Sequence, residues 1–220
     1  MKILGRFTWN QVAVFFIALL PFANLAYDAY SGGLTFNPIQ EATFRTGKLA
    51  LIFLLLSLAC TPLNTIFGWR GSIRYRRMLG LFAFFYASIH FLIFVALDYG
   101  LSWPLIKEAI LEKRYAVVGF SAFLILLPLA LTSTKGWQKR LKKGWKRLHQ
   151  LVYLAGILVI IHFVWLVKSD VREPLLWGTA LAVLLALRIP PVRRAASRLR
   201  YKFHLRSPLR RERESGLAPE

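Results

Sequence analysis

Three of the four histidines in this chain lie within or at the edge of long apolar segments. These are His90, His149 and His162, whereas His204 lies in a polar tail. An ionisable side chain is costly in an apolar environment, so its presence there marks a candidate functional site. Neutral imidazole is also the commonest protein ligand for a metal. The sequence therefore predicts a buried metal centre, with haem iron as the first candidate.

The spacing of the histidines limits which of them can share a metal. His149 and His162 are 13 residues apart, which is ~20 Å along one helix. A single zinc site built from all three histidines is therefore excluded if this segment is one helix. An ideal helix also places His149 and His162 roughly 220° apart, so they share no face unless the helix bends or His149 sits in a frayed first turn.

The segments that must position these residues are typical of membrane helices. The chain of 220 residues is 56% hydrophobic, and its mean hydropathy is +0.48. Apolar blocks of this length fit helices, because barrel strands would show about ten residues of alternating character. We therefore expect an all-α integral membrane protein with a bundle of six transmembrane helices. The spans are expected at roughly 9–29, 47–66, 78–97, 116–133, 148–168 and 174–190.

The net charge of +20 is distributed by side. With a cytoplasmic N-terminus, 23 of the 30 Lys and Arg residues fall in cytoplasmic segments, and the outer segments are close to neutral. This is the positive-inside pattern, so both termini are expected to be cytoplasmic. The same pattern explains the charge better than nucleic-acid binding does, and no nucleic-acid partner is expected.

This topology pairs two of the histidines by depth. His90 and His162 both lie in the outer halves of their spans, about 12 and 14 residues from the cytoplasmic ends. They can face each other across an axially bound haem between helices of a bundle. His149 lies at the inner edge of its span and is a weaker ligand candidate. Its alternative role is that of an interfacial residue bonded to a carbonyl or a phospholipid.

Arginines and glycines near the spans allow two interpretations each. Arg76 and Arg77 precede the third span and can contact haem propionates or a flavin phosphate, although topology also explains their charge. Gly80, Gly119 and Gly156 can admit a flat cofactor or allow close helix packing. No internal repeat is evident in the sequence. A short interfacial helix is expected within 106–111.

The chain divides into two parts. Residues 1–194 are expected to form one six-helix haem-binding transmembrane domain. Residues 195–220 are expected to form a basic cytoplasmic tail that is attracted to anionic lipid and is disordered.

Four segments carry a resemblance to a known family. They are 76–90, with RRMLGL, FFYA and the histidine; 113–133, with KRY, the glycine and LPLALTS; 145–165, with WKRLHQLVY and HFVW; and the earlier 56–63, with LS and TPL. Together they resemble the MsrQ (YedZ) family over about residues 5–190. The fold of that family is similar to the ferric reductase-like transmembrane domain.

The resemblance implies a haem b membrane subunit of the bacterial inner membrane. It implies a heterodimer with an MsrP-like periplasmic molybdopterin reductase that repairs methionine sulfoxide in oxidised periplasmic proteins. It further implies electrons from the quinone pool or a cytosolic flavin reductase, and FMN beside one or two haems b. The wider superfamily commonly carries two histidines on each of spans three and five. This chain has only His90 in span three, which departs from that pattern.

We therefore expect an electron-transfer subunit of an oxidoreductase rather than a complete enzyme, with no residue performing group transfer. The haem-binding residues are expected to be His90 and His162, with His149 as the weaker candidate. Two alternatives remain open. One is a stand-alone transmembrane ferric reductase, and the other is a non-redox membrane anchor for a soluble partner. The candidate docking loops for a partner are 31–46, 98–115 and 169–173.

Overall fold

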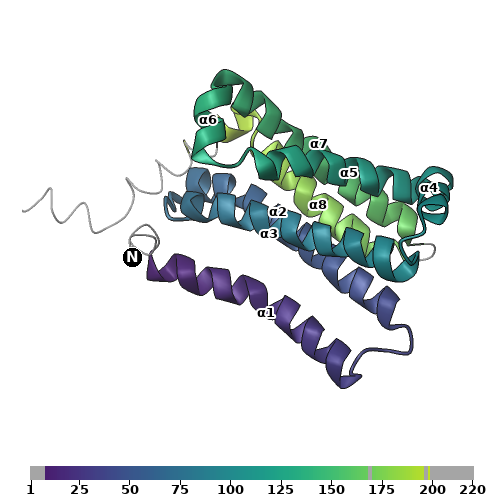
Figure 1. Cartoon of the computed structure of the whole chain (residues 1–220). Coiled ribbons are helices and arrows are strands. Elements are labelled where there is room, and N and C mark those ends of the chain that lie inside the picture. Colours follow the sequence, from purple (N-terminus) through teal and green to yellow (C-terminus); the bar gives the residue numbers. More distant parts are fainter. Residues whose placement is uncertain (1–7, 168–169, 196–197, 199–220) are drawn as a thin grey trace, which may run out of the picture.

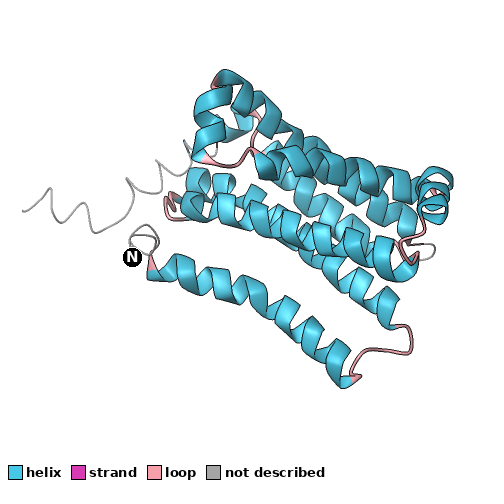
Figure 2. Cartoon of the chain, in the orientation of Figure 1, coloured by secondary structure: helices cyan, strands magenta, loops and turns pink. Residues whose placement is uncertain are grey.

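The computed structural model describes residues 8–167, 170–195 and 198. Within these residues the chain is helical and contains no strand (Figure 2). The long helices are α1 (Trp9–Ser31), α2 (Pro38–Phe67), α3 (Ser72–Leu92), α5 (Arg114–Leu131), α7 (Lys143–Leu166) and α8 (Arg172–Ala186). A π-helical segment η2 (Ile93–Asp98) continues α3, and the short helices are α4 (Trp103–Glu112) and α6 (Lys135–Leu141).

Five helices are long and apolar enough to cross a membrane: α1, α2, α3 with η2, α5 and α7. They overlap the first five predicted spans, although α2 and α3 begin several residues earlier than predicted. The sixth predicted span contains α8, which has 15 residues. At 1.5 Å per residue α8 is about 22 Å long, shorter than the ~30 Å apolar thickness of a bilayer. The expected helix near 106–111 is present as α4, whereas α6 was not anticipated.

Two antiparallel hairpins form the body of the bundle (Figure 1). Helix α2 packs against α3, and α5 packs against α7, with α8 beside α7 and α2. The α1–α2 loop and α4 lie at one end, which the charge pattern predicts to be outside; we call it the predicted outer end. The start of α1, α6 and the last turn of α8 lie at the opposite, predicted inner end (Figure 1).

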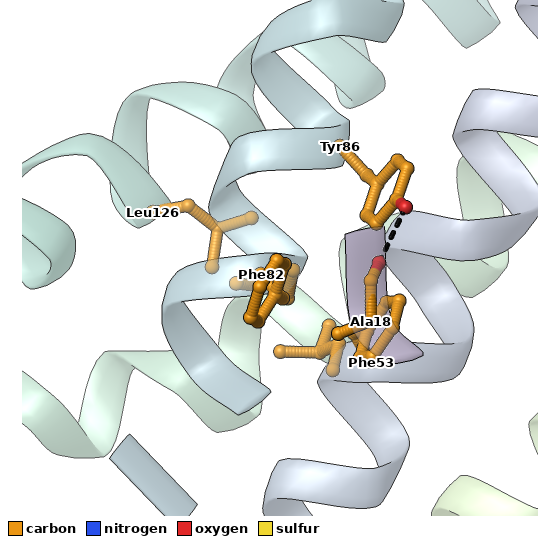
Figure 3. Close-up of a cluster of buried hydrophobic side chains, with 8 residues drawn as sticks. Ala18, Phe53, Phe82, Tyr86 and Leu126 are labelled. Atoms are coloured by element: carbon orange, nitrogen blue, oxygen red, sulfur yellow. Dashed lines mark hydrogen bonds between the residues drawn. The ribbon is translucent and has the colours of Figure 1, made fainter. Parts of the chain in front are cut away.

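Helix α1 lies apart from the other helices over much of its length and contacts them at few points (Figure 1). The phenol of Tyr86 in α3 donates a 2.7 Å hydrogen bond to the carbonyl of Ala18 (Figure 3). Tyr86 is fully buried and stacks on Phe53 of α2 with ring centres 5.3 Å apart. Phe82 lies within the same core cluster. This aromatic cluster joins α1, α2 and α3 in the middle of the bundle.

Ion pairs join the helices at the predicted outer end. The guanidinium of Arg45 in α2 contacts Asp28 of α1 and Glu41 of α2, each at 2.5 Å. Lys48 of α2 contacts Glu173 of α8, also at 2.5 Å. Exposed pairs of this kind contribute little to stability. They connect α1 and α8 to α2 at this end.

The predicted division of the chain is only partly covered by the structure. The basic tail expected over 195–220 lies almost wholly outside the described residues. The division into a domain ending at 194 and a disordered tail stays a prediction.

Candidate metal centre

His90 of α3 and His162 of α7 lie next to each other between the two hairpins. Their ring centres are 6.2 Å apart, and the ring planes are nearly perpendicular, at 87°. Both side chains are largely shielded from solvent. The two histidines that the charge pattern placed at equal depth are therefore neighbours in the folded chain.

Each ring is held through its Nδ1 atom by a backbone carbonyl. Nδ1 of His90 lies 2.9 Å from the carbonyl oxygen of Thr43, and Nδ1 of His162 lies 2.7 Å from that of Tyr115. A carbonyl oxygen only accepts, so both Nδ1 atoms donate. A neutral imidazole carries one N–H, which leaves each Nε2 with a free lone pair. This hydrogen-bonding pattern orients metal-ligating histidines and increases their basicity.

A glycine lies against each ring. A Cβ atom added to Gly47 would lie 3.0 Å from Nδ1 of His90, and one added to Gly119 would lie 2.6 Å from Nδ1 of His162. The absence of a side chain at these positions lets each ring reach the carbonyl one turn earlier on the facing helix. Gly119 was one of the three glycines singled out in the sequence, and Gly47 was missed.

The other two singled-out glycines serve helix packing. A Cβ on Gly80 would meet the hydroxyl of Ser57 at 3.3 Å, and one on Gly156 would meet Leu181 at 3.2 Å. Neither contact involves a histidine. The contacts of these two glycines agree with the packing interpretation, whereas Gly119 makes room for the His162 ring. That Gly119 admits a flat cofactor stays a prediction.

The two hairpins repeat one arrangement of carbonyl, glycine and histidine. In each, the glycine follows the carbonyl by four residues and precedes the histidine by 43 residues. The members are Thr43, Gly47 and His90 in the first hairpin and Tyr115, Gly119 and His162 in the second. A shift of 72 residues relates the two sets. The tripeptide Ile-His-Phe recurs at 89–91 and 161–163 in the same register, but most other positions differ, and the repeat was missed in the sequence.

The ring of His149 is hydrogen-bonded differently from the other two. Its ring stacks on Trp145 at 4.0 Å, and its Nε2 lies 3.2 Å from the hydroxyl of Thr132. That hydroxyl donates its only hydrogen to the carbonyl of Pro128 at 2.6 Å, so Nε2 of His149 must be the donor to Thr132. The Nε2 atom that the other two histidines leave free is therefore occupied here.

His149 and His162 contact the same helix, although an ideal helix places their side chains roughly 220° apart. Both contact α5, His162 at Tyr115 near its start and His149 at Thr132 just beyond its end. The short α6 connection keeps the end of α5 beside the first turns of α7, so His149 meets it there. The predicted separation in depth along α7 is present, and His149 lies near the predicted inner end.

Arg76 and Arg77 lie near the start of α3, with His149 rather than with the histidine pair. Arg76 interacts electrostatically with His149. Its carbonyl accepts a 2.8 Å hydrogen bond from Ser57. His90 is 13 residues beyond Arg77, or ~20 Å along α3. These arginines can therefore contact an acidic group only at the predicted inner end. The shift of 72 residues places Arg77 in the position that corresponds to His149.

A cation lies close to Tyr115 at the predicted outer end. The ammonium group of Lys113 donates to the phenol of Tyr99 at 2.7 Å and lies 5.4 Å from the centre of that ring. The hydrogen bond to Tyr99 raises the pKa of Lys113. Lys113 therefore keeps its positive charge at this end of the bundle.

The geometry of the pair suits one kind of metal centre. An imidazole nitrogen lies about 1.1 Å from its ring centre, and a metal–imidazole bond is about 2.0–2.1 Å. Two imidazoles on opposite sides of one metal would have ring centres about 6.2–6.4 Å apart, close to the 6.2 Å observed. Among the described residues no group of three or more His, Cys, Asp and Glu side chains can hold a metal. A centre with two axial imidazoles and a macrocycle in the other positions, as in haem, fits these residues.

Comparison with known proteins agrees with this chemistry. Residues 46–160 match the family described as ferric reductase like transmembrane component. The chain is 51% identical over 178 residues to the protein-methionine-sulfoxide reductase haem-binding subunit MsrQ of Xanthomonas euvesicatoria, covering 78% of this chain and 82% of that protein. It is 44% identical over 190 residues to the protein of the same name from Rhodospirillum rubrum, covering 86% and 91%. No solved structure matches.

The matched family segment begins in α2 and ends in α7. It contains His90 and the carbonyl of Tyr115, whereas Thr43 and His162 lie just outside its two ends. The similarity to the bacterial relatives extends over most of the chain. The chain belongs to the MsrQ family of ferric reductase-like membrane proteins.

Proposed function

We propose that this chain is a haem b electron-transfer subunit in which His90 and His162 are the axial ligands of one haem. The observation that carries the proposal is the pair itself. Two rings 6.2 Å apart each donate Nδ1–H to a carbonyl and leave Nε2 free. The relatives' printed name, a haem-binding subunit, supports the same assignment.

The residues around the pair hold the ligands and exclude water. The carbonyls of Thr43 and Tyr115 fix both rings in the ligating tautomer. Phe91 stacks on Phe120 and Phe123 of α5 next to this region, with ring centres 5.7 and 4.9 Å apart. A bound haem supplies a one-electron carrier whose potential depends on its axial ligands and its burial.

We propose a six-span topology in the bacterial inner membrane with both termini cytoplasmic. The basic residues support it, because 23 of the 30 Lys and Arg residues fall in segments that this topology places in the cytoplasm. Helix α8 also runs from the predicted outer end to the inner end (Figure 1). Reporter fusions after residue 195 and within 98–102 test this. An outward-facing reporter after residue 195 would contradict it.

The partners are proposed from the family resemblance. We propose that electrons pass from the quinone pool or a cytosolic flavin reductase to an MsrP-like periplasmic molybdopterin reductase that forms a heterodimer with this chain and repairs oxidised periplasmic proteins. The word "subunit" in the relatives' name supports the existence of a partner. FMN remains a family-based proposal without a site, since the described residues contain no glycine-rich phosphate loop.

A reduced-minus-oxidised spectrum of the purified protein tests the haem assignment. We expect a haem b α band, and dithionite-reduced protein should be reoxidised by an MsrP-like reductase with methionine sulfoxide present. A folded but colourless protein would contradict the proposal and favour a membrane anchor. Reduction of ferric salts at the same rate without the molybdopterin partner would favour a stand-alone ferric reductase, which the matched family description makes the second candidate.

A further inference from the structure

Arg188 lies just beyond α8 and joins three helices at the predicted inner end. Its guanidinium donates to the carbonyl of Leu58 in α2 at 2.5 Å and to the phenol of Tyr153 in α7 at 2.9 Å. It also lies 5.1 Å from the centre of the Tyr153 ring. Leu58 has a free carbonyl because Pro62, four residues on, lacks an N–H group. Part of the role of Arg188 is therefore to satisfy this acceptor.

The positive charge of Arg188 has no carboxylate partner among the described residues. All seven described Asp and Glu residues lie at the opposite end, and so do the three ion pairs. The charged or titratable groups that interact with Arg188 here are Tyr153, Cys60 and a second cation, Arg76. A half-buried guanidinium beside another cation is unfavourable unless an anion balances the pair.

Two buried polar atoms in the same region have no hydrogen-bond partner. One is Nε of Arg188, and the other is the hydroxyl oxygen of Thr61, three residues after Leu58 on α2. Buried polar groups are nearly always hydrogen-bonded, so each orphan needs an explanation. A group rich in acceptors can satisfy a guanidinium N–H and a hydroxyl together. The unbalanced charge and the two unpaired atoms thus point to the same kind of ligand.

We propose that Arg188 and Arg76, with the hydroxyl of Thr61, form an oxyanion site at the predicted inner end between α2, α3, α7 and α8. The site takes one phosphate or carboxylate group, because planar guanidinium donors match such oxygens. Two sources carry this chemistry: the headgroup of an anionic phospholipid and the acidic group of a tightly bound cofactor. The lipid source rests on the proposed topology, whereas the site itself depends on neither topology nor haem.

The lipid source is tested by native mass spectrometry and thermal unfolding of the full chain in detergent, titrated with phosphatidylglycerol or with phosphatidylcholine. We expect phosphatidylglycerol to bind and to raise the unfolding temperature, and phosphatidylcholine to do neither. Arg188→Gln should weaken phosphatidylglycerol binding by about tenfold or more, as expected for a lost charge-assisted hydrogen bond. Arg74→Gln is the matched control, because Arg74 is an exposed arginine near the same end.

Arg76→Gln is a second variant that tests the site even if Arg188→Gln fails to fold, because it leaves the contact between Arg188 and Leu58 intact. If a cofactor is the source, phosphatidylglycerol has no effect, and haem or flavin per protein falls in Arg188→Gln and Arg76→Gln but not in Arg74→Gln. The proposal is overturned if both variants bind phosphatidylglycerol and cofactors as the unchanged chain does. Because lipid binding is read by mass, the lipid test is independent of the haem assignment.

Discussion

The two ends of the α5–α7 hairpin hold one histidine each, and they hold them differently. At the predicted outer end His162 donates Nδ1–H to the carbonyl of Tyr115, and its ring centre lies 6.2 Å from that of His90. At the predicted inner end His149 donates Nε2–H to the hydroxyl of Thr132 and stacks on Trp145. The first histidine has a free Nε2 and a second imidazole opposite. The second has neither.

Burial in apolar surroundings does not by itself leave a histidine nitrogen free to bind a metal. Both histidines sit in apolar surroundings on the same helix, so hydropathy does not distinguish them. The distinction lies in which ring nitrogen is hydrogen-bonded and in what occupies the matching position of the other hairpin. By the shift of 72 residues, the position that matches His162 is His90, and the position that matches His149 is Arg77. A metal centre at the inner end would therefore use Nδ1 of His149, or Nε2 after a change of hydrogen bonding, together with a ligand other than a second histidine.

The largest effect is expected from removing either member of the outer pair. His90→Ala or His162→Ala should abolish the haem held between these rings, because one axial ligand and its supporting hydrogen bond are lost together. Haem per protein by pyridine haemochrome assay measures this. His204→Ala, in the tail, is the control. Full retention of haem in His90→Ala would show that the pair is not the ligand set.

A smaller effect is expected from filling the space beside the rings. Gly119→Ala places a Cβ 2.6 Å from Nδ1 of His162, so the ring must move and its bond to Tyr115 weakens. Loss of such supporting contacts typically lowers metal affinity by about 10–100-fold. Gly47→Ala, with 3.0 Å to His90, should have a milder effect of the same kind.

Haem retention and midpoint potential measure both glycine variants. The control is Gly144→Ala, in the same helix as His162, where an added Cβ meets nothing within 4 Å. If Gly119→Ala and Gly144→Ala behave alike, the close contact with His162 has no role in ligation.

His149→Ala should affect only the inner end. We expect the haem of the outer pair to persist, with its spectrum unchanged, because His149 lies ~20 Å from His162 along α7. Any loss should be confined to a second haem with a different signal in low-temperature electron paramagnetic resonance. The comparison fails if His149→Ala removes haem as completely as His162→Ala does.

The smallest effect is expected at Thr132. Thr132→Val removes the acceptor of His149 Nε2–H and should cost about 1 kcal/mol of stability or less, because His149 is only partly buried. Thermal unfolding measures this cost, and the outer haem band should not change. A shift of the outer band would mean that the two ends are coupled.

Several features of the site were predictable from residue types, and others were not. The placement of His90 and His162 at equal depth followed from hydropathy and charge, and the rings indeed lie 6.2 Å apart. Gly47 was missed because a glycine in an apolar helix has no feature that reveals its neighbour. The acceptors Thr43 and Tyr115 were missed because they act through their main-chain carbonyls, which every residue carries.

The sequence by itself determined the helical membrane class, the alternation of charge and the depth of each histidine. Each of these properties depends only on residues along one segment, so it can be predicted without knowing which helices pack together. The tertiary structure decided which helices meet, which carbonyl receives each Nδ1–H and that His149 uses Nε2 instead. Those choices depend on contacts between residues 17 to 47 positions apart, and short polar contacts are set by packing rather than by composition.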